Sequence, residues 1–383
     1  MMIVATAIEA MSGDDEEWPL HGGAKPSAAL HGALAGGEAM DQTVRPDRAA
    51  TAYWVTGPGQ GELRRESLPE PGEGAALVRS LYSGYSRGTE RLVLANRVPQ
   101  RVAGLMQAPH QEGSFPCPVK YGYLSVGVVE EGPDELIGRT VFCLYPHQDR
   151  YVVPVAELAV VPDGVPARRA VLAGAVETAV NALWDAAPRI GDRVAVVGCG
   201  LVGGAVLALL RRFPLGRLEA VDSDPGKAAL AHSLAVDFAL PDDARDDCDL
   251  VVHCSARPEG LARSLELAGN DAEVLELSWY GEQPVSVPLG ADFHARRLSL
   301  RSSQVGEVAL ARRHRRTHTE RLALALRLLA DPVFDVFLGG PTDFEDLPRD
   351  AAELAAGRLD GLCHVIRYPG AEEETGHVHT DRP

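Results

Sequence analysis

The stretch RVAVVGCGLVGGAV constrains the fold of this chain more than any other. RVAVV is an apolar run typical of a buried strand, and LVGGAV begins a helical pattern. Between them, Gly198 permits a tight turn, Gly200 lets the backbone approach a pyrophosphate, and Gly203 lets the helix pack close to the strand. The first helical turn, at Leu201 and Val202, would offer unpaired N–H groups to the phosphates. The stretch therefore predicts a dinucleotide-binding turn.

The next strand, RLEAVDSD, carries the residue that would select the dinucleotide. Asp222 ends this strand 19 residues after Gly203, where a carboxylate can accept hydrogen bonds from an adenosine ribose. No arginine follows directly, so Asp222 and Asp224 would repel a 2′-phosphate without a clear partner. NAD is therefore favoured over NADP. The alternative is a glycine turn that serves only the architecture of an α/β domain.

The pattern of strands and helices changes near residue 166. Before it, short apolar runs such as AALVRSLYSG and RTVFCLYP are separated by Gly, Pro and Asp turns, which indicates a β-rich region. After it, strands such as CDLVVHCSA alternate with helices such as PEGLARSLELA. This alternation predicts an α/β chain with a parallel sheet and right-handed crossovers.

Composition excludes several classes of protein. A chain of 383 residues with 45% hydrophobic residues suits two domains with buried cores. A net charge of −17 argues against a nucleic-acid partner and against anionic membranes. The six cysteines are scattered without a CxxC motif, which favours a reducing cytoplasm. We find no 18-residue apolar run and no basic start before one, so we expect no membrane span and no signal peptide.

Four motifs carry a resemblance to a known family: SGYSRGTE (83–90), KYGYLSVGVV (120–129), GCGLVG and the strand end LSWYG. Together they resemble the medium-chain dehydrogenase/reductase superfamily, that of the zinc-type alcohol dehydrogenases. The resemblance covers about residues 51–369. The resemblance implies a GroES-like β-rich catalytic domain and a doubly wound Rossmann domain. We expect the following division: a disordered extension over 1–49, the first part of the catalytic domain over 50–175, the Rossmann domain over 176–308, a return to the catalytic domain over 309–370, and a tail over 371–383.

The positions that hold catalytic zinc in this superfamily are changed here. Zinc members use a cysteine, the histidine of a Gly-His-Glu motif and a third Cys, His or Glu. The corresponding positions look like Ser86, then Gly122-Tyr123-Leu124, with Glu177 in the third place; one carboxylate does not hold zinc. The cysteine run of a structural zinc lobe is also missing. We therefore expect no metal. The SG-x-S-x-GTERL and Y-x-SVG patterns are similar to the zinc-lacking bacteriochlorophyllide a dehydrogenase branch, which oxidises a hydroxyethyl group on a tetrapyrrole.

Without zinc, a side chain must give or take the proton. Tyr123 stands where the histidine ligand would point, and Lys120, three residues away, would lower the pKa of its phenol. Thr89 resembles the hydroxyl that relays protons in zinc relatives, and Ser86 is an alternative. His147, in a loop entering a strand, would face the cleft. The alternatives are a pocket-lining aromatic for Tyr123 and a surface position for His147.

Three further stretches have expected roles. Trp279 ends the strand that should pass the nicotinamide, so we expect it to contact the cofactor. RRLSLRSS (296–303) lies where this superfamily pairs subunits edge to edge, which implies a homodimer. The basic run RRHRRTH (312–318) would either meet a substrate anion or form a solvated loop.

The sequence thus predicts a zinc-independent NAD(H)-dependent dehydrogenase/reductase that interconverts a secondary alcohol, including a ring-conjugated one, and its ketone. One alternative is an NADPH-dependent enone or quinone reductase, against which Asp222 argues. The other is a catalytically silent dinucleotide-binding protein.

Overall fold

The computed structural model describes residues 48–371. The extension expected over 1–49 and the tail expected over 371–383 therefore lie almost wholly outside the described residues. Within residues 48–371, none of the helices combines the length and the apolar character that crossing a bilayer requires.

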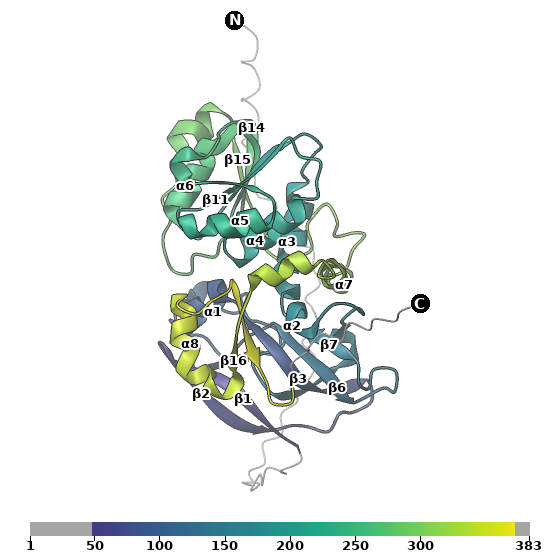
Figure 1. The fold of residues 1–383 in the computed structure, drawn as a ribbon. Helices are drawn as coiled ribbons and strands as arrows, with labels where there is room; N and C mark the ends of the chain where they lie inside the picture. Colours follow the sequence, from purple (N-terminus) through teal and green to yellow (C-terminus); the bar gives the residue numbers. More distant parts are fainter. Residues whose placement is uncertain (1–47, 372–383) are drawn as a thin grey trace, which may run out of the picture. The chain divides into compact units, whose positions relative to one another are not determined.

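The β-rich lobe consists of β1–β9 together with β16 and β17 (Figure 1). A four-stranded sheet has the order β2-β1-β5-β4, and a seven-stranded sheet has the order β16-β17-β3-β6-β7-β9, with β8 paired to β3. The many short strands follow from the turn residues between the apolar runs. The strands are β1 (Ala49–Gly57), β2 (Gln60–Ser67), β3 (Ala75–Tyr85), β4 (Glu112–Gly113), β5 (Val119–Lys120), β6 (Ser125–Glu131), β7 (Thr140–Cys143), β8 (Arg150–Pro154), β9 (Ala159–Val160), β16 (Leu338–Asp343) and β17 (Cys363–Arg367).

The Rossmann lobe is built on a six-stranded sheet in which every neighbouring pair is parallel. Its order is β12-β11-β10-β13-β14-β15. From β10 the chain adds β11 and β12 on one side, and it then crosses over to add β13, β14 and β15 on the other side. Ligands of such sheets bind outside the carboxyl ends of the strands at this switch point. The strands are β10 (Arg193–Val197), β11 (Arg217–Val221), β12 (Asp237–Ala239), β13 (Cys248–His253), β14 (Ala268–Glu276) and β15 (Ser299–Ser302).

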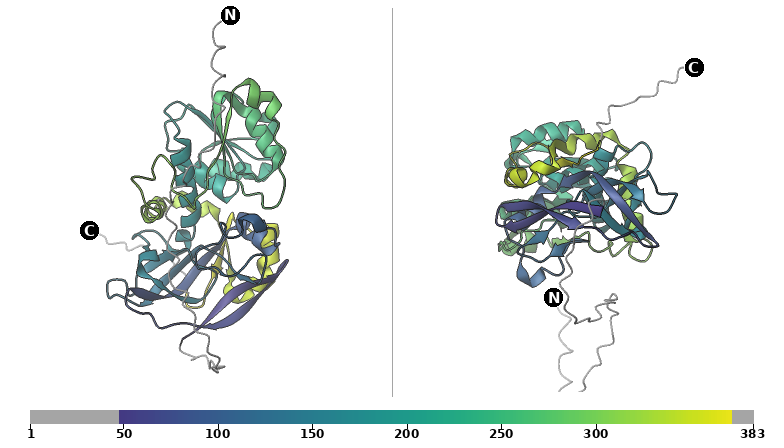
Figure 2. Two further views of the ribbon diagram at one scale, coloured as in Figure 1. Left: turned by 180° about the vertical axis from the view of Figure 1, so that it is seen from behind. Right: turned by 90° about the horizontal axis from the view of Figure 1, so that it is seen from below.

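Helices cover both faces of this sheet (Figures 1 and 2). Alternate residues of each strand point to opposite faces: Val194 and Val196 of β10 join one core with α3 and α4, whereas Ala195 and Val197 join a second core with α6. The strands buried on both faces explain the continuous apolar runs in the sequence. The helices are α1 (Arg87–Leu94), α2 (Ala167–Ala170), α3 (Ala173–Ala186), α4 (Leu201–Leu210), α5 (Ala228–Ser233), α6 (Pro258–Leu267), α7 (His318–Leu328) and α8 (Leu347–Ala356).

After β15 the chain returns to the β-rich lobe. A capping box at Thr317 begins α7, because the side chains of Thr317 and Glu320 each bond the other's backbone N–H. Further along, β17 pairs antiparallel with β3, with Val365 opposite Gly84. This pairing ties the last strand to SGYSRGTE, so residues from both ends of the described chain meet at one site. The predicted α/β fold class, a GroES-like lobe plus a Rossmann lobe, is confirmed.

Candidate active site

The glycine turn between β10 and α4 has the geometry that its spacing predicts. Gly198 has a φ of +101°, and a Cβ on it would lie 2.6 Å from the backbone N of Ser255. A Cβ on Gly203 would lie 1.9 Å from the carbonyl oxygen of Gly198, so only glycine allows this helix to approach the strand. At Gly200 nothing lies within 4 Å of an added Cβ. The open side at Gly200 therefore fits a pyrophosphate approaching the first turn of α4.

Asp222 lies directly after β11, and its carboxylate is held in place by two backbone N–H groups. Oδ2 accepts from the N–H of Cys199 at 2.7 Å, and Oδ1 accepts from the N–H of Asp224 at 2.9 Å. Each oxygen keeps a further lone pair that can accept from a ribose hydroxyl. Leu201 and Val202 are half-buried in the first turn of α4, beside the same turn. The structure thus brings the predicted cofactor residues that follow β10 and β11 to one edge of the sheet.

Trp279 follows β14 and contacts the β-rich lobe. It is half-buried and packs against an apolar cluster that includes Tyr85 and Val93. The backbone two residues later lies close to α1 as well, since a Cβ on Gly281 would lie 3.1 Å from Cδ2 of Leu92. Tyr123 packs against the same cluster. The end of β14 and the predicted catalytic tyrosine therefore border one patch of core, which we call the shared cluster.

Three of the predicted catalytic residues come together: the phenol of Tyr123 and the hydroxyls of Ser86 and Thr89. The side chains of Ser86 and Thr89 both hydrogen-bond to Tyr123, and by themselves these bonds would lower its pKa. Burial and the negative charge of Glu90 outweigh them and raise the pKa of Tyr123 to about 12. Ser86 precedes α1 and Thr89 lies in its first turn, so this helix start positions both hydroxyls. Tyr123 is therefore a protonated hydrogen-bond donor at neutral pH.

Lys120 does not belong to this group, contrary to the expectation that it would act on Tyr123. Its ammonium contacts Glu66 at 2.8 Å, Gln148 at 2.9 Å and Glu112. The reason is the topology: Lys120 lies in β5 of the four-stranded sheet, whereas Tyr123 lies just before β6 of the seven-stranded sheet. Lys120 is fully buried and neutralised by two carboxylates. It is a structural cation of the β-rich lobe.

His147 is buried, with an exposed fraction of 1%, so it lies neither at the surface nor facing a cleft, contrary to both interpretations of the sequence. Its Nε2 lies 2.9 Å from Oε2 of Glu90, and its Nδ1 lies 2.7 Å from the hydroxyl of Ser83, which contacts the hydroxyl of Tyr368 at 3.0 Å. The other oxygen of Glu90 accepts from the backbone N–H of Ser86 at 2.6 Å. His147 therefore orients the carboxylate that, together with burial, raises the pKa of Tyr123.

The residues that the resemblance places at zinc-ligand positions are engaged with other side chains. Glu177, the remaining carboxylate, is bound to Arg321 at 3.0 Å, and both side chains are buried. Ser86 is a neutral hydroxyl engaged with Tyr123. Within the described residues 48–371, no group of three or more His, Cys, Asp or Glu side chains is placed to hold a metal ion. A zinc site needs about three such protein ligands.

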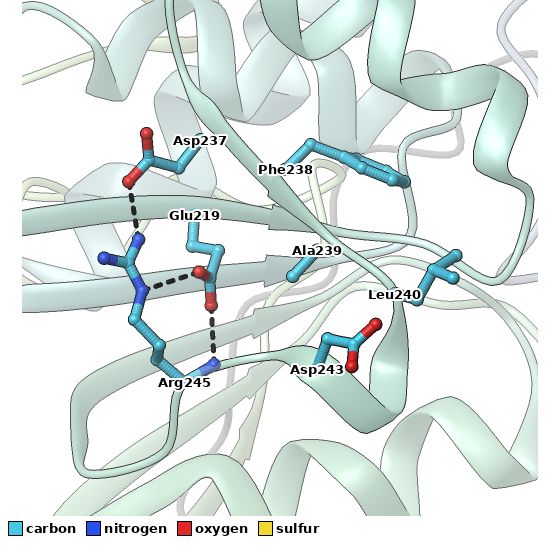
Figure 3. Close-up of a pocket in the computed structure, with 7 residues that line it drawn as sticks. All are labelled: Glu219, Asp237, Phe238, Ala239, Leu240, Asp243 and Arg245. Carbon is cyan, nitrogen blue, oxygen red and sulfur yellow. Dashed lines mark hydrogen bonds and ion pairs between the residues drawn. The ribbon is translucent and has the colours of Figure 1, made fainter.

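A hollow of about 480 Å³ lies beside the edge strand β12 (Figure 3). Arg245 binds Glu219 at 2.8 Å and Asp237 at 2.5 Å, so its guanidinium is already paired with two carboxylates of the lining. The hollow involves β11 and β12 and not the carboxyl end of β13, so we assign it no part in catalysis. Its lining residues are Glu219, Asp237, Phe238, Ala239, Leu240, Asp243 and Arg245.

The sequence interpretation missed Glu90 and a second buried group at the end of β13. Glu90 was visible only as part of the SGYSRGTE pattern, and its burial depends on His147, which is 57 residues away along the chain. The second group contains His253, Ser255 and Glu276. The signal for it was present: two polar residues, in VVHCS and VLELS, interrupt apolar strands just where these strands should end.

Comparison with known sequences gives one partial match. No protein-family model matches the chain. The L-threonine 3-dehydrogenase of Bacillus velezensis is 28% identical over 126 residues, which cover 30% of this chain and 36% of that enzyme. The chain thus matches about a third of the length of this curated relative.

Solved structures match far more of the chain. The 2R,3R-butanediol dehydrogenase of Bacillus subtilis has a TM-score of 0.68 at 15% identity and covers 83% of this chain and 99% of its own. The L-idonate 5-dehydrogenase of Escherichia coli K-12 has a TM-score of 0.69 at 15% identity, with coverages of 83% and 98%. A zinc-binding dehydrogenase from Sinorhizobium meliloti 1021 bound to NADP has a TM-score of 0.67 at 16% identity, with coverages of 83% and 99%. These likenesses show the two-lobe fold of such dehydrogenases.

Proposed function

We propose that this chain is an NAD(H)-dependent dehydrogenase/reductase that interconverts a secondary alcohol and its ketone without zinc. The observation that carries the proposal is the packing of Tyr123 and Trp279 against the shared cluster. This shared packing supports a site in which the phenol of Tyr123 lies near the end of β14, where we propose that the dinucleotide binds. The names of the structural neighbours, butanediol and idonate dehydrogenases, agree with alcohol chemistry on this fold.

The dinucleotide, when bound, supplies or accepts the hydride. Tyr123 holds the proton, because its pKa is about 12. The phenol can therefore hydrogen-bond to a carbonyl oxygen and protonate it as negative charge develops on that oxygen. The hydroxyls of Ser86 and Thr89 fix the phenol and offer a path for its reprotonation. For alcohol oxidation the phenol would first have to lose its own proton, and a pKa of about 12 leaves little phenolate near neutral pH. We therefore expect ketone reduction to have the higher kcat near neutral pH.

Such a site suits a particular kind of substrate. Zinc polarises the substrate oxygen as a Lewis acid, whereas Tyr123 offers one neutral donor. A carbinol conjugated to a large ring needs less polarisation, because charge at the reacting carbon is delocalised. We propose a ring-conjugated secondary alcohol or its ketone, in keeping with the resemblance to the bacteriochlorophyllide a dehydrogenase branch.

Zinc independence gives a direct prediction. Protein purified without chelator should contain far less than one zinc per chain by elemental analysis, because Glu177 is paired with Arg321 and Ser86 with Tyr123. Incubation with a chelator should leave turnover unchanged, and added zinc should not raise it. A near-stoichiometric zinc content that is lost together with activity would contradict this part of the proposal.

Cofactor choice gives a second prediction. The carboxylate of Asp222 would repel a 2′-phosphate. Lys227 is a nearby positive charge: it lowers the pKa of Cys199, whereas Asp222 raises it. Lys227 would therefore weaken the repulsion. Replacing Asp222 with alanine should remove the repulsion and narrow the ratio of NADPH to NADH dissociation constants by about tenfold. The control is Asp224→Ala, which leaves the carboxylate at the strand end in place. An unchanged ratio in Asp222→Ala would show that this carboxylate does not select the cofactor.

The edge strand β15 supports the homodimer that the sequence predicts. The edge strand β15 is exposed at all four residues, and among residues 48–371 its strand partner is β14 alone. We propose that two copies pair through it. A reducing cytoplasm remains the location that the cysteine pattern predicts.

A further inference from the structure

A buried polar group lies at the switch point of the Rossmann sheet, outside the Tyr123 group. His253 is the last residue of β13 and is fully buried. Ser255 lies two residues after it. Glu276 is the last residue of β14 and lies opposite His253 in the sheet. Since an added Cβ on Gly198 would lie 2.6 Å from the N of Ser255, Ser255 borders the glycine turn directly. The group thus lines the edge where a dinucleotide crosses from β10 to β13.

The hydrogen bonds of this group fix the direction in which each proton points. A carboxylate only accepts, so Nδ1 of His253 donates to Oε2 of Glu276 at 2.8 Å. In the neutral imidazole, Nε2 then accepts from the hydroxyl of Ser255 at 2.6 Å. The backbone N–H of Arg257 donates to the same hydroxyl oxygen at 3.2 Å. Oγ of Ser255 is left with one lone pair that can accept a hydrogen bond.

The surroundings hold this arrangement rigidly. Glu276 also accepts from the hydroxyl of Tyr280 at 3.0 Å and from the N–H of Ser278 at 2.6 Å. Burial opposes its ionisation, but the bonds from His253 and Ser278 prevail and lower the pKa of Glu276 below its usual value, so it carries its charge at neutral pH. A Cβ on Gly260 would lie 2.3 Å from Oγ of Ser255, so the start of α6 closes one side of the group.

The two halves of a Rossmann sheet bind the two nucleotides of a dinucleotide. Asp222, after β11, belongs to the half expected to hold the adenosine ribose. His253, Ser255 and Glu276 belong to the half formed by β13, β14 and β15. The nucleotide over this half is then the one that carries nicotinamide. Its ribose offers hydroxyl donors of the kind that the free lone pair of Ser255 accepts.

We propose that Ser255 binds the nicotinamide ribose of the dinucleotide, and that His253 and Glu276 are positioning residues that hold its hydroxyl for this contact. The inference rests on the proposed function, since it needs a bound dinucleotide. It adds a contact in the second half of the cofactor site. The same order of Ser, His and Glu also occurs in triads whose serine is a nucleophile. In the present proposal the hydroxyl of Ser255 binds the cofactor and does not attack a substrate.

The test compares ADP with ADP-ribose, which differ by the second ribose, by calorimetric titration of the full chain. Wild type should bind ADP-ribose more tightly than ADP. Ser255→Ala should bind ADP as wild type does and lose about 5- to 10-fold in affinity for ADP-ribose and NADH. The matched control is Ser233→Ala, an exposed serine whose hydroxyl bonds within α5; it should change neither affinity.

Two histidine variants separate positioning from general stability. The amide of His253→Gln reaches about as far as Nε2 and keeps a partner for Ser255. The amide of His253→Asn lies near Nδ1 and keeps only the contact with Glu276. We expect His253→Gln to retain more ADP-ribose affinity than His253→Asn at similar melting temperatures. Equal ADP-ribose affinity in Ser255→Ala and wild type would overturn the inference, as would labelling of Ser255 by a fluorophosphonate. Failure of wild type to bind ADP or NADH at all would instead overturn the proposed function.

Discussion

Replacing Tyr123 with phenylalanine should lower the kcat for ketone reduction about 10²- to 10⁴-fold while NADH affinity stays the same. The phenol hydrogen-bonds to both Ser86 and Thr89, and phenylalanine keeps the ring in the shared cluster without the hydroxyl. The measurement is single-turnover oxidation of bound NADH with a panel of ring-conjugated ketones, using a ketone that wild type reduces.

The pH dependence of the same reaction follows from the raised pKa of Tyr123. The phenol keeps its proton below about 12 and loses it only as the pH rises through that value. Reduction should therefore show no loss from tyrosine ionisation at pH values up to about 10, where an ordinary tyrosine is half ionised. The matched control for Tyr123→Phe is Tyr145→Phe, which removes a phenol hydroxyl from a ring that stacks on Tyr151 in another core cluster. Near-normal turnover in Tyr123→Phe would remove Tyr123 from the mechanism.

Replacing Glu90 with alanine should lower the free energy of unfolding by about 3 kcal/mol or more. The change leaves Nε2 of His147 and the N–H of Ser86 without partners in a buried place, and each such group costs about 1–3 kcal/mol. Glu90→Gln keeps the shape and part of the bonding, so we expect a loss of about 1 kcal/mol. Urea unfolding followed by circular dichroism measures both.

Glu90→Gln should also change the pKa of Tyr123, which a loss of stability alone would not explain. The charge of Glu90 raises the pKa of Tyr123, so its removal should lower that pKa. A rise in tyrosinate absorbance at a lower pH than in wild type would show this. The control is Glu62→Ala, an exposed residue paired with Arg64, which should change stability by less than about 0.5 kcal/mol. An unshifted Tyr123 titration in Glu90→Gln would contradict the electrostatic role.

The fold was predictable because its main signals are local. The strand RVAVV and its glycine turn lie within one short stretch, and a Cβ at Gly203 meets the carbonyl oxygen of Gly198 just five residues away. The alternation of apolar strands and helices after residue 166 likewise needs no long-range knowledge. The return of the chain to the β-rich lobe came from the family resemblance and matches the pairing of β17 with β3.

The candidate site was predictable only in part, because its contacts are non-local. Ser86 and Thr89 meet Tyr123 through the start of α1, as the motif suggested. Lys120, however, is near Tyr123 only in sequence, since the chain passes from one sheet to the other between them. Sequence spacing alone does not show which carboxylates a buried lysine or histidine will meet. The pairing of His253 with Glu276 depends likewise on strand order, which places β13 beside β14.

The central claim is that this chain binds NADH beside Trp279, and a titration with NADH and NADPH followed by tryptophan emission tests it most directly. The account predicts strong quenching by NADH, weaker quenching by NADPH, and loss of most of the quenching in Trp279→Phe with the affinity for NADH retained. Preference for NADPH would favour the enone or quinone reductase. Binding of neither dinucleotide would contradict the account, because the glycine turn would then serve only the architecture of the fold.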